Sequence, residues 1–298
     1  MTEGGRSGLS LARLGLTDDG AADALTKLGW WIHGRVSQDA ENVLWALSRA
    51  PDPNLALRTL ARLATAAGPG WDELDAALRL EQGARGRLLG LLGSSTALGD
   101  HLVAHPPRWH GPAAAGVLAP DWTDRAAQRL LAAVGADPAD PARASLTGVK
   151  AQRTLRETYR DLIAELAAAD LAAVVEPELP VVPFEQVTAA LADLAIGVLR
   201  AALAVAVTEV TARGPVPRLA VIGMGKCGGA ELNYVSDVDV IFVAEAEDEL
   251  GVATKLASVM MRFASACFEV DAALRPEGKF GALVRTLDGY LAYYRRWA

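Results

Sequence analysis

The sequence is poor in cysteine and in positive charge, and each shortage excludes a class of protein. Its 298 residues include two cysteines, Cys227 and Cys267, which are too few for a disulfide framework. We therefore expect reduced thiols and a cytoplasmic protein. The net charge of −7 lacks the basic footprint of nucleic-acid-binding proteins, so we expect no nucleic-acid partner.

Long apolar runs and targeting signals are also missing. The longest apolar stretch, Ala201–Val207, is far shorter than the roughly 20 residues that span a bilayer, so we expect no membrane partner. The first residues, MTEGGRSGLS, lack the basic and apolar regions of a signal peptide. Because residues 1–16 are rich in glycine and serine, we expect them to be frayed.

Alanine and leucine dominate what is present, and both favour helices. Between residues 18 and 103, apolar residues recur at helical spacing with breaks at proline and glycine. One such helix is expected over residues 55–67 with Asn54 as its N-cap. The clearest periodicity predicts two long helices, over residues 141–172 and 184–211.

After about residue 215 the pattern changes to short runs of branched residues. These runs predict strands near residues 218–223, 238–243 and 269–274, with a helix over 250–268. The sequence therefore predicts a mostly helical α+β protein. We place a helical N-terminal region at residues 1–183 and an α/β module with its lead-in helix at residues 184–298.

A glycine-rich turn follows the first predicted strand. Gly228 and Gly229 lack side chains, so their backbone N–H groups could face an anion, and we assign them to phosphate binding. A short helix is expected to begin near Gly229 and to add positive potential there. The spacing matches neither a P-loop, because no Lys-Ser/Thr pair follows, nor a dinucleotide fingerprint.

Two carboxylates, Asp237 and Asp239, head the second predicted strand. Residues two apart on a strand share a face, and two like charges there favour a bound cation. Hard oxygen ligands suit Mg²⁺, so we predict a catalytic magnesium site. Asp271 on the third strand is the predicted third ligand, and Glu269, two residues earlier on the same face, is its rival.

Other residues near this constellation have two interpretations each. Lys226 and Arg275 could contact phosphates or be ordinary surface cations, and Ser236 could bind phosphate or cap the turn. Cys227 is interpreted as a packing residue, because no histidine lies near it in sequence. The four histidines show no metal-ligand spacing and are interpreted as structural: His33, His101, His105 and His110.

The sequence GMGKCGGAELNYVSDVDVIF at residues 223–242 resembles the signature of the glutamine synthetase adenylyltransferase family, also called adenylyl-removing enzymes. Two further segments agree with family patterns. They are DAALRPEG at residues 271–278 and LGSSTALGDHLVAHP at residues 92–106. Ala273 stands where the family pattern has its first arginine.

The resemblance implies a polymerase-β-like nucleotidyltransferase module in which Asp237, Asp239 and Asp271 hold Mg²⁺. It further implies the deadenylylating, N-terminal half of a two-domain enzyme, in which phosphate removes AMP from a tyrosine of glutamine synthetase and releases ADP. The other half attaches AMP from ATP. A PII-type signal protein is the implied regulatory partner. Family members continue beyond the position of Ala298, so we expect the module to be truncated there.

Two alternatives remain open from the sequence. The same site could serve another nucleotidyltransferase, for example a PII uridylyltransferase. Alternatively, the chain could be a non-catalytic scaffold that binds glutamine synthetase through its helices.

Overall fold

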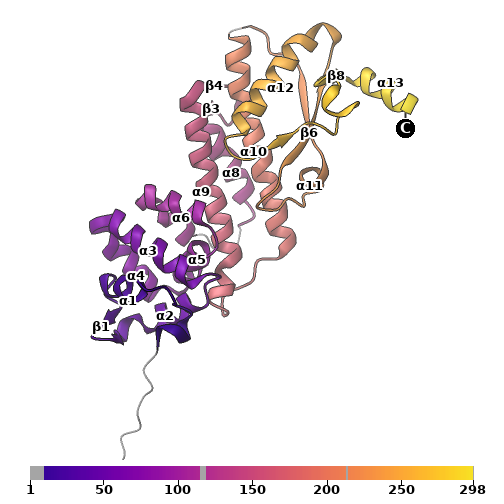
Figure 1. Cartoon of the computed structure of the whole chain (residues 1–298). Coiled ribbons are helices and arrows are strands. Elements are labelled where there is room, and N and C mark those ends of the chain that lie inside the picture. The colour runs from indigo at the N-terminus through magenta and orange to yellow at the C-terminus, as the bar shows by residue number, and fades with distance from the viewer. Residues whose placement is uncertain (1–9, 115–118, 213, 298) are drawn as a thin grey trace, which may run out of the picture. The chain divides into compact units, whose positions relative to one another are not determined.

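The computed structural model describes residues 10–114, 119–212 and 214–297 (Figure 1). The chain forms two compact units, each assembled from two stretches of sequence. The first unit comprises residues 1–119 and 164–182, and the second comprises residues 120–163 and 183–298. Residues 1–9, which make up most of the segment expected to be frayed, lie outside the described residues. Leu11–Leu14, however, form a 3-10 turn that buries Leu14.

The first unit is almost entirely helical, as its spacing predicts. It also contains a two-stranded antiparallel hairpin of β1 and β2. Its elements are α1 (Ala21–Lys27), β1 (Trp31–Ile32), β2 (Arg35–Val36), α2 (Glu41–Ser48), α3 (Pro53–Ala67), α4 (Trp71–Leu80), α5 (Gln82–Leu92), α6 (Thr96–Ala104), α7 (His110–Ala114) and the last part of α9 (Gly148–Val175).

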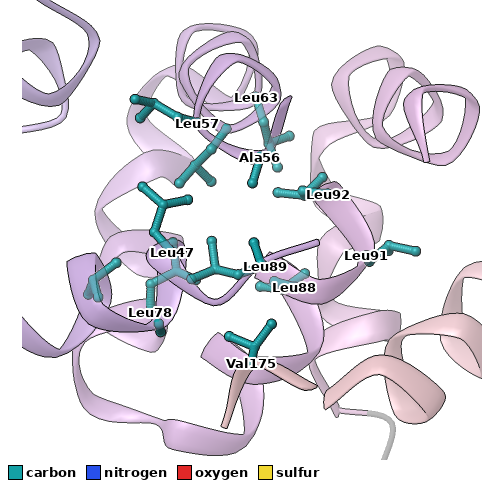
Figure 2. Close-up of a cluster of buried hydrophobic side chains, with 14 of the residues drawn as sticks. Leu47, Ala56, Leu57, Leu63, Leu78, Leu88, Leu89, Leu91, Leu92 and Val175 are labelled. Atoms are coloured by element: carbon teal, nitrogen blue, oxygen red, sulfur yellow. The ribbon is translucent and has the colours of Figure 1, made fainter. Parts of the chain in front are cut away.

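Leucine side chains from several helices fill the core of the first unit (Figure 2). Leu57 and Leu63 of α3 and Leu88 of α5 are at most 2% exposed, and Val175 at the end of α9 joins them. Burial of each such side chain stabilises the fold by about 1.5–3 kcal/mol. This unit thus has a core of its own.

The start of α3 differs from the prediction by two residues. Asp52, and not Asn54, is the N-cap, because its carboxylate accepts the N–H of Leu55 at 2.9 Å while Pro53 occupies the first helical position. The Asn54 side chain instead accepts the N–H of Thr17 at 3.0 Å. Asn54 therefore anchors the preceding segment.

The second unit combines long helices with a four-stranded sheet. Its elements are α8 (Trp122–Ala133), β3 (Ala136–Asp137), β4 (Asp140–Ala144), the first part of α9, α10 (Phe184–Thr211), β5 (Leu219–Gly223), α11 (Gly225–Gly228), β6 (Val238–Ala244), α12 (Leu250–Ala264), β7 (Val270–Asp271), β8 (Val284–Thr286) and α13 (Leu287–Trp297). The α+β class with mostly helical content is confirmed.

Strand β6 is the centre of the sheet (Figure 1). β5 pairs antiparallel with it, with Gly223 opposite Val240. β7 and β8 both pair parallel with β6, β7 at its beginning and β8 at its end. Helix α12 packs on β6 and β8, and α10 packs against α12. The beginning of β6 is consequently fixed by neighbours on both sides.

By length and composition alone, helix α10 (Phe184–Thr211) could cross a membrane. Its apolar segment extends well beyond the uninterrupted run Ala201–Val207, because it includes only a few polar residues. However, 78% of that apolar segment is buried inside the protein, and α8, α12 and β4 pack on the helix. At Gly197 an added Cβ would lie 2.8 Å from Leu130 of α8, so glycine permits this close packing. We interpret α10 as a core helix.

Several boundaries differ from the predictions. The expected helix over residues 141–172 begins only at Gly148, because residues 140–144 form β4 and pack on α10. The third strand is reduced to Val270–Asp271. The predicted boundary at residue 183 lies next to a boundary between the units, but residues 120–163, assigned to the helical region, belong to the second unit.

Candidate active site

The site begins where β5 turns into β6. β5 ends at Gly223, α11 makes one helical turn, and an irregular segment leads to β6 at Val238. The N–H of Met224 donates to the carbonyl of Asp239 at 2.9 Å. This bond extends the β5–β6 pairing and holds the glycine-rich turn beside the start of β6.

Three carboxylates converge at that point. Oxygens of Asp237, Asp239 and Asp271 lie within 4.8 Å of one another. Asp239 and Asp271 are direct partners in the parallel register of β6 and β7, and Asp237 directly precedes β6, two residues before Asp239. The structure thus brings together the three aspartates that the sequence analysis selected.

Glu269, the rival of Asp271, has a different place. Its backbone carbonyl accepts the N–H of Val238 at 2.9 Å and thereby starts the β6–β7 pairing. Its carboxylate is not part of the acidic group found among the described residues. Its role in the site is therefore to fix the strand register that places Asp271 opposite Asp239.

The three charges act on one another. The pKa of Asp239 is raised, first by burial and then by the negative charges of Asp237 and Asp271, while Lys226 opposes the shift. Like charges at this separation disfavour the ionised form, and a divalent cation would favour it. The arrangement is that of an acidic site suited to a hard cation with oxygen ligands.

Gly225 is a site residue that the sequence analysis missed. Its φ of +51° lies in the left-handed region, and an added Cβ would be 2.6 Å from Oδ2 of Asp239. Only glycine leaves room for the carboxylate at this point. The sequence does contain this glycine, two residues after Gly223. However, spacing alone does not show which glycine of the turn lies against a carboxylate.

Gly228 and Gly229 do not present their amides as predicted. The short helix α11 precedes Gly229 and does not start there. Within it, the N–H of Gly228 donates to Met224 and that of Gly229 to Gly225, at 2.9 and 3.0 Å. The expectation that these two amides face an anion is therefore wrong, because both close the turn. Gly228 is required for another reason, since a Cβ there would lie 2.5 Å from the carbonyl of Gly223.

The remaining predicted site residues divide into two groups. Lys226 is exposed on α11 and its charge reaches Asp239, and Ser236 is half-buried directly before Asp237. Arg275 has its guanidinium turned into its own loop, where it donates to three backbone carbonyls. The first two could meet a phosphate, whereas three of the five N–H donors of Arg275 bind carbonyls of its own loop.

Cys227 behaves as the packing residue that was predicted. Its side chain is buried, and burial raises the pKa of its thiol. A neutral thiol is a poor nucleophile. The acidic group found among the described residues contains no histidine. The rings of His101 and His105 lie in tilted contact with each other in the first unit, with their centroids 5.0 Å apart.

Comparison with known proteins decides the family. The sequence profile of glutamate-ammonia ligase adenylyltransferase matches residues 86–298, and this range includes all three aspartates. The chain belongs to this family. Similar relatives are the bifunctional glutamine synthetase adenylyltransferase/adenylyl-removing enzymes of Nocardia farcinica, Mycobacterium tuberculosis and Mycobacterium leprae. They are 55%, 52% and 50% identical over 296, 290 and 292 residues.

The similarity to these adenylyltransferases covers nearly the whole chain but a small part of each relative. It extends over 97% of this chain and 28% of each of the three enzymes. The family resemblance predicted from residues 223–242 is confirmed. The name of these relatives gives two activities, those of a glutamine synthetase adenylyltransferase and of an adenylyl-removing enzyme.

Proposed function

We propose that the chain carries a polymerase-β-like nucleotidyltransferase centre that removes AMP from an adenylyl-tyrosine of glutamine synthetase by phosphorolysis. In this reaction an oxygen of inorganic phosphate bonds to the phosphorus of the diester, and the bond from phosphorus to the tyrosine oxygen breaks. ADP leaves, and the tyrosine oxygen retains the electron pair and takes up a proton. The main support is the convergence of three aspartates, Asp237 directly before β6, Asp239 in β6 and Asp271 in β7, in a chain of this family.

Mg²⁺ is the proposed cofactor, and the donor set fits it. Three carboxylates within 4.8 Å of one another supply hard oxygen ligands. The pKa of Asp239 is raised by burial first and then by the charges of Asp237 and Asp271, and a bound cation would offset that repulsion. When bound, the ion neutralises charge on the phosphoryl oxygens. Asp237, Asp239 and Asp271 would hold it.

The surrounding residues would orient the diester. Lys226 carries an exposed positive charge beside the carboxylates, and we assign it to a phosphate oxygen. Ser236 offers a hydroxyl directly before Asp237. Gly228 and Gly229 shape the turn that presents Lys226, and Gly225 leaves the space that Asp239 occupies.

The direction of reaction and the partners follow from the family resemblance. The sequence Glu231-Leu232-Asn233 before the acidic pair resembles the N-terminal, deadenylylating half of the family, and this resemblance supports the phosphorolysis direction. We propose glutamine synthetase as the protein substrate, a PII-type protein as the regulator, phosphate and ADP as the small reactants, and the cytoplasm as the location. ATP would be used in the adenylylation reaction.

The test is a phosphorolysis assay. Adenylylated glutamine synthetase is incubated with the chain, Mg²⁺ and inorganic phosphate, and ADP is quantified. We expect ADP to form, and Asp239→Asn to reduce its rate at least about 100-fold. Asp248→Asn, an exposed acid of the same unit, is the matched control and should leave the rate unchanged.

Other outcomes would select other functions. AMP in place of ADP would indicate hydrolysis, and transfer of label from ATP to unmodified glutamine synthetase would indicate the adenylylation direction. UMP transfer to a PII-type protein would support the uridylyltransferase alternative. Binding of glutamine synthetase without any turnover, unaffected by Asp239→Asn, would support the scaffold and contradict the proposed function.

A further inference from the structure

The loop between β7 and β8 is folded around the side chain of Arg275. Its Nε donates to the carbonyl of Gly281 at 3.1 Å, one Nη to that of Ala272 at 2.7 Å, and the other to that of Lys279 at 3.0 Å. The guanidinium therefore joins the first residue of the loop to residues seven and nine positions later. It is half-buried inside the loop.

The same loop starts directly after a proposed metal ligand. Ala272, whose carbonyl accepts the shortest of the three bonds, follows Asp271. Asp271 in turn accepts the N–H of Ala273 through Oδ1 at 2.7 Å, which fixes the direction of its carboxylate. Any shift of residues 272 and 273 would thus move the carboxylate that faces Asp239.

The backbone of this loop needs such an anchor. Glu277 and Gly278 have φ values of +65° and +59°, in the left-handed region. At Gly281 an added Cβ would lie 2.0 Å from the carbonyl of Pro276, so the two ends of the turn touch. A left-handed non-glycine residue persists only where its surroundings hold it in place, and the bonds from Arg275 supply part of that constraint.

We propose that Arg275 is a positioning residue that holds the β7–β8 loop closed and so keeps Asp271 in the metal site. The inference rests on the proposed function for the role of Asp271. It replaces the prediction that Arg275 contacts phosphate, because three of its N–H groups already bind backbone carbonyls. A planar fork with donors in three directions suits this task, and a lysine ammonium cannot reach three carbonyls so far apart along the loop.

The test measures binding of Mn²⁺ alone to the whole chain by electron paramagnetic resonance, with no substrate present. We expect Arg275→Lys to weaken Mn²⁺ binding at least about tenfold, the range seen when residues that orient metal ligands are changed. Its circular dichroism should match that of the unaltered chain. Arg262→Lys is the matched control, since Arg262 forms an exposed ion pair with Glu209 on another part of the unit, and its Mn²⁺ binding should not change.

A second variant tests the loop independently of charge. Gly281→Ala leaves Arg275 in place but forces the turn open, so it should weaken Mn²⁺ binding as well. If Arg275→Lys does not fold, Gly281→Ala still tests whether the loop positions Asp271. Unchanged Mn²⁺ binding in either folded variant, or an Arg275→Lys defect confined to the KM for phosphate, would overturn the positioning role. Absence of Mn²⁺ binding by the unaltered chain would instead overturn the metal site itself.

Discussion

Gly225 leaves just enough room for the Asp239 carboxylate, and a single methyl group there would remove it. In Gly225→Ala, the new Cβ would lie 2.6 Å from Oδ2 of Asp239, and the φ of +51° would be strained. We expect a loss of about 1–2 kcal/mol in stability and at least about 100-fold in phosphorolysis rate, the effect of a misplacement near 1 Å. Urea unfolding and the ADP assay measure the two effects.

The control for that substitution is Gly251→Ala. Gly251 lies at the start of α12 with no atom within 4 Å of an added Cβ. Stability and rate should remain close to those of the unaltered chain. Equal effects of the two substitutions would show that the closeness of Gly225 to Asp239 has no functional meaning.

Asp239→Asn should have opposite effects on stability with and without metal. Without a divalent ion, the substitution removes one of three like charges, and the raised pKa of Asp239 shows that its charge is unfavourable there. The unfolding temperature should therefore rise. Mg²⁺ should stabilise the unaltered chain, because a ligand that binds the native state adds to stability, and should not stabilise the variant. Thermal unfolding at both conditions measures this, and an equal response of the two proteins to Mg²⁺ would contradict it.

At the scale of single residues, the sequence identifies the acidic residues of the site better than the residues that position them. Asp237 and Asp239 could be chosen because strand periodicity alone puts them on one face. Asp271 could be chosen as the acid of the neighbouring strand. The role of Gly225 depends on an acid 14 residues later, and that of Arg275 on the path of its loop. Neither follows from local spacing.

At the scale of elements, the long periodic helices were predicted most closely. α10 has the predicted bounds, because its apolar pattern continues over 28 residues. β8, at Val284–Thr286, was not predicted, because three residues cannot display a period of two convincingly. The start of α9 was predicted too early because β4, a tertiary partner of α10, precedes it.

The segment after α9 is joined to α5 by a buried ion pair. Arg85 and Glu176 are 8% and 6% exposed at their side chains, and Arg85 also donates to the carbonyl of Leu78 at 3.2 Å. In Glu176→Gln the arginine charge would remain buried without its partner, so we expect a loss of about 3–5 kcal/mol in the free energy of unfolding. Urea unfolding measures it.

An exposed pair of the same unit provides the comparison. Arg62 and Asp100 are 54% and 50% exposed, so Asp100→Asn should change the unfolding free energy by less than about 1 kcal/mol. Similar losses in the free energy of unfolding from Glu176→Gln and Asp100→Asn would show that burial does not increase the contribution of the Arg85–Glu176 pair to stability.

At the scale of the whole molecule, the chain forms two compact units, and among the residues that the structure describes one group of three acids converges, in the second unit. Since all three aspartates belong to the second unit, Mg²⁺ should slow hydrogen exchange in β6, β7 and the loop that follows. Exchange in the helices of the first unit, such as α3 and α5, should not change. Mass spectrometry of peptides with and without Mg²⁺ measures this, and protection confined to the first unit would place the ion elsewhere.

The predicted division of the chain at residue 183 shows what sequence cannot supply at this scale. A change in periodicity marks where the sheet begins, but not that residues 120–163 return to pack on α10. Such pairing depends on contacts between segments far apart in the chain. Family resemblance, by contrast, depended on local motifs and was confirmed.

The most direct test of the acidic site is a crystal structure of the chain soaked in Mn²⁺, with anomalous diffraction recorded at the manganese edge. We predict an anomalous peak coordinated by carboxylate oxygens of Asp237, Asp239 and Asp271, and no such peak in Asp239→Asn. A map without manganese at these three carboxylates, or with the ion bound only elsewhere on the chain, would contradict this prediction.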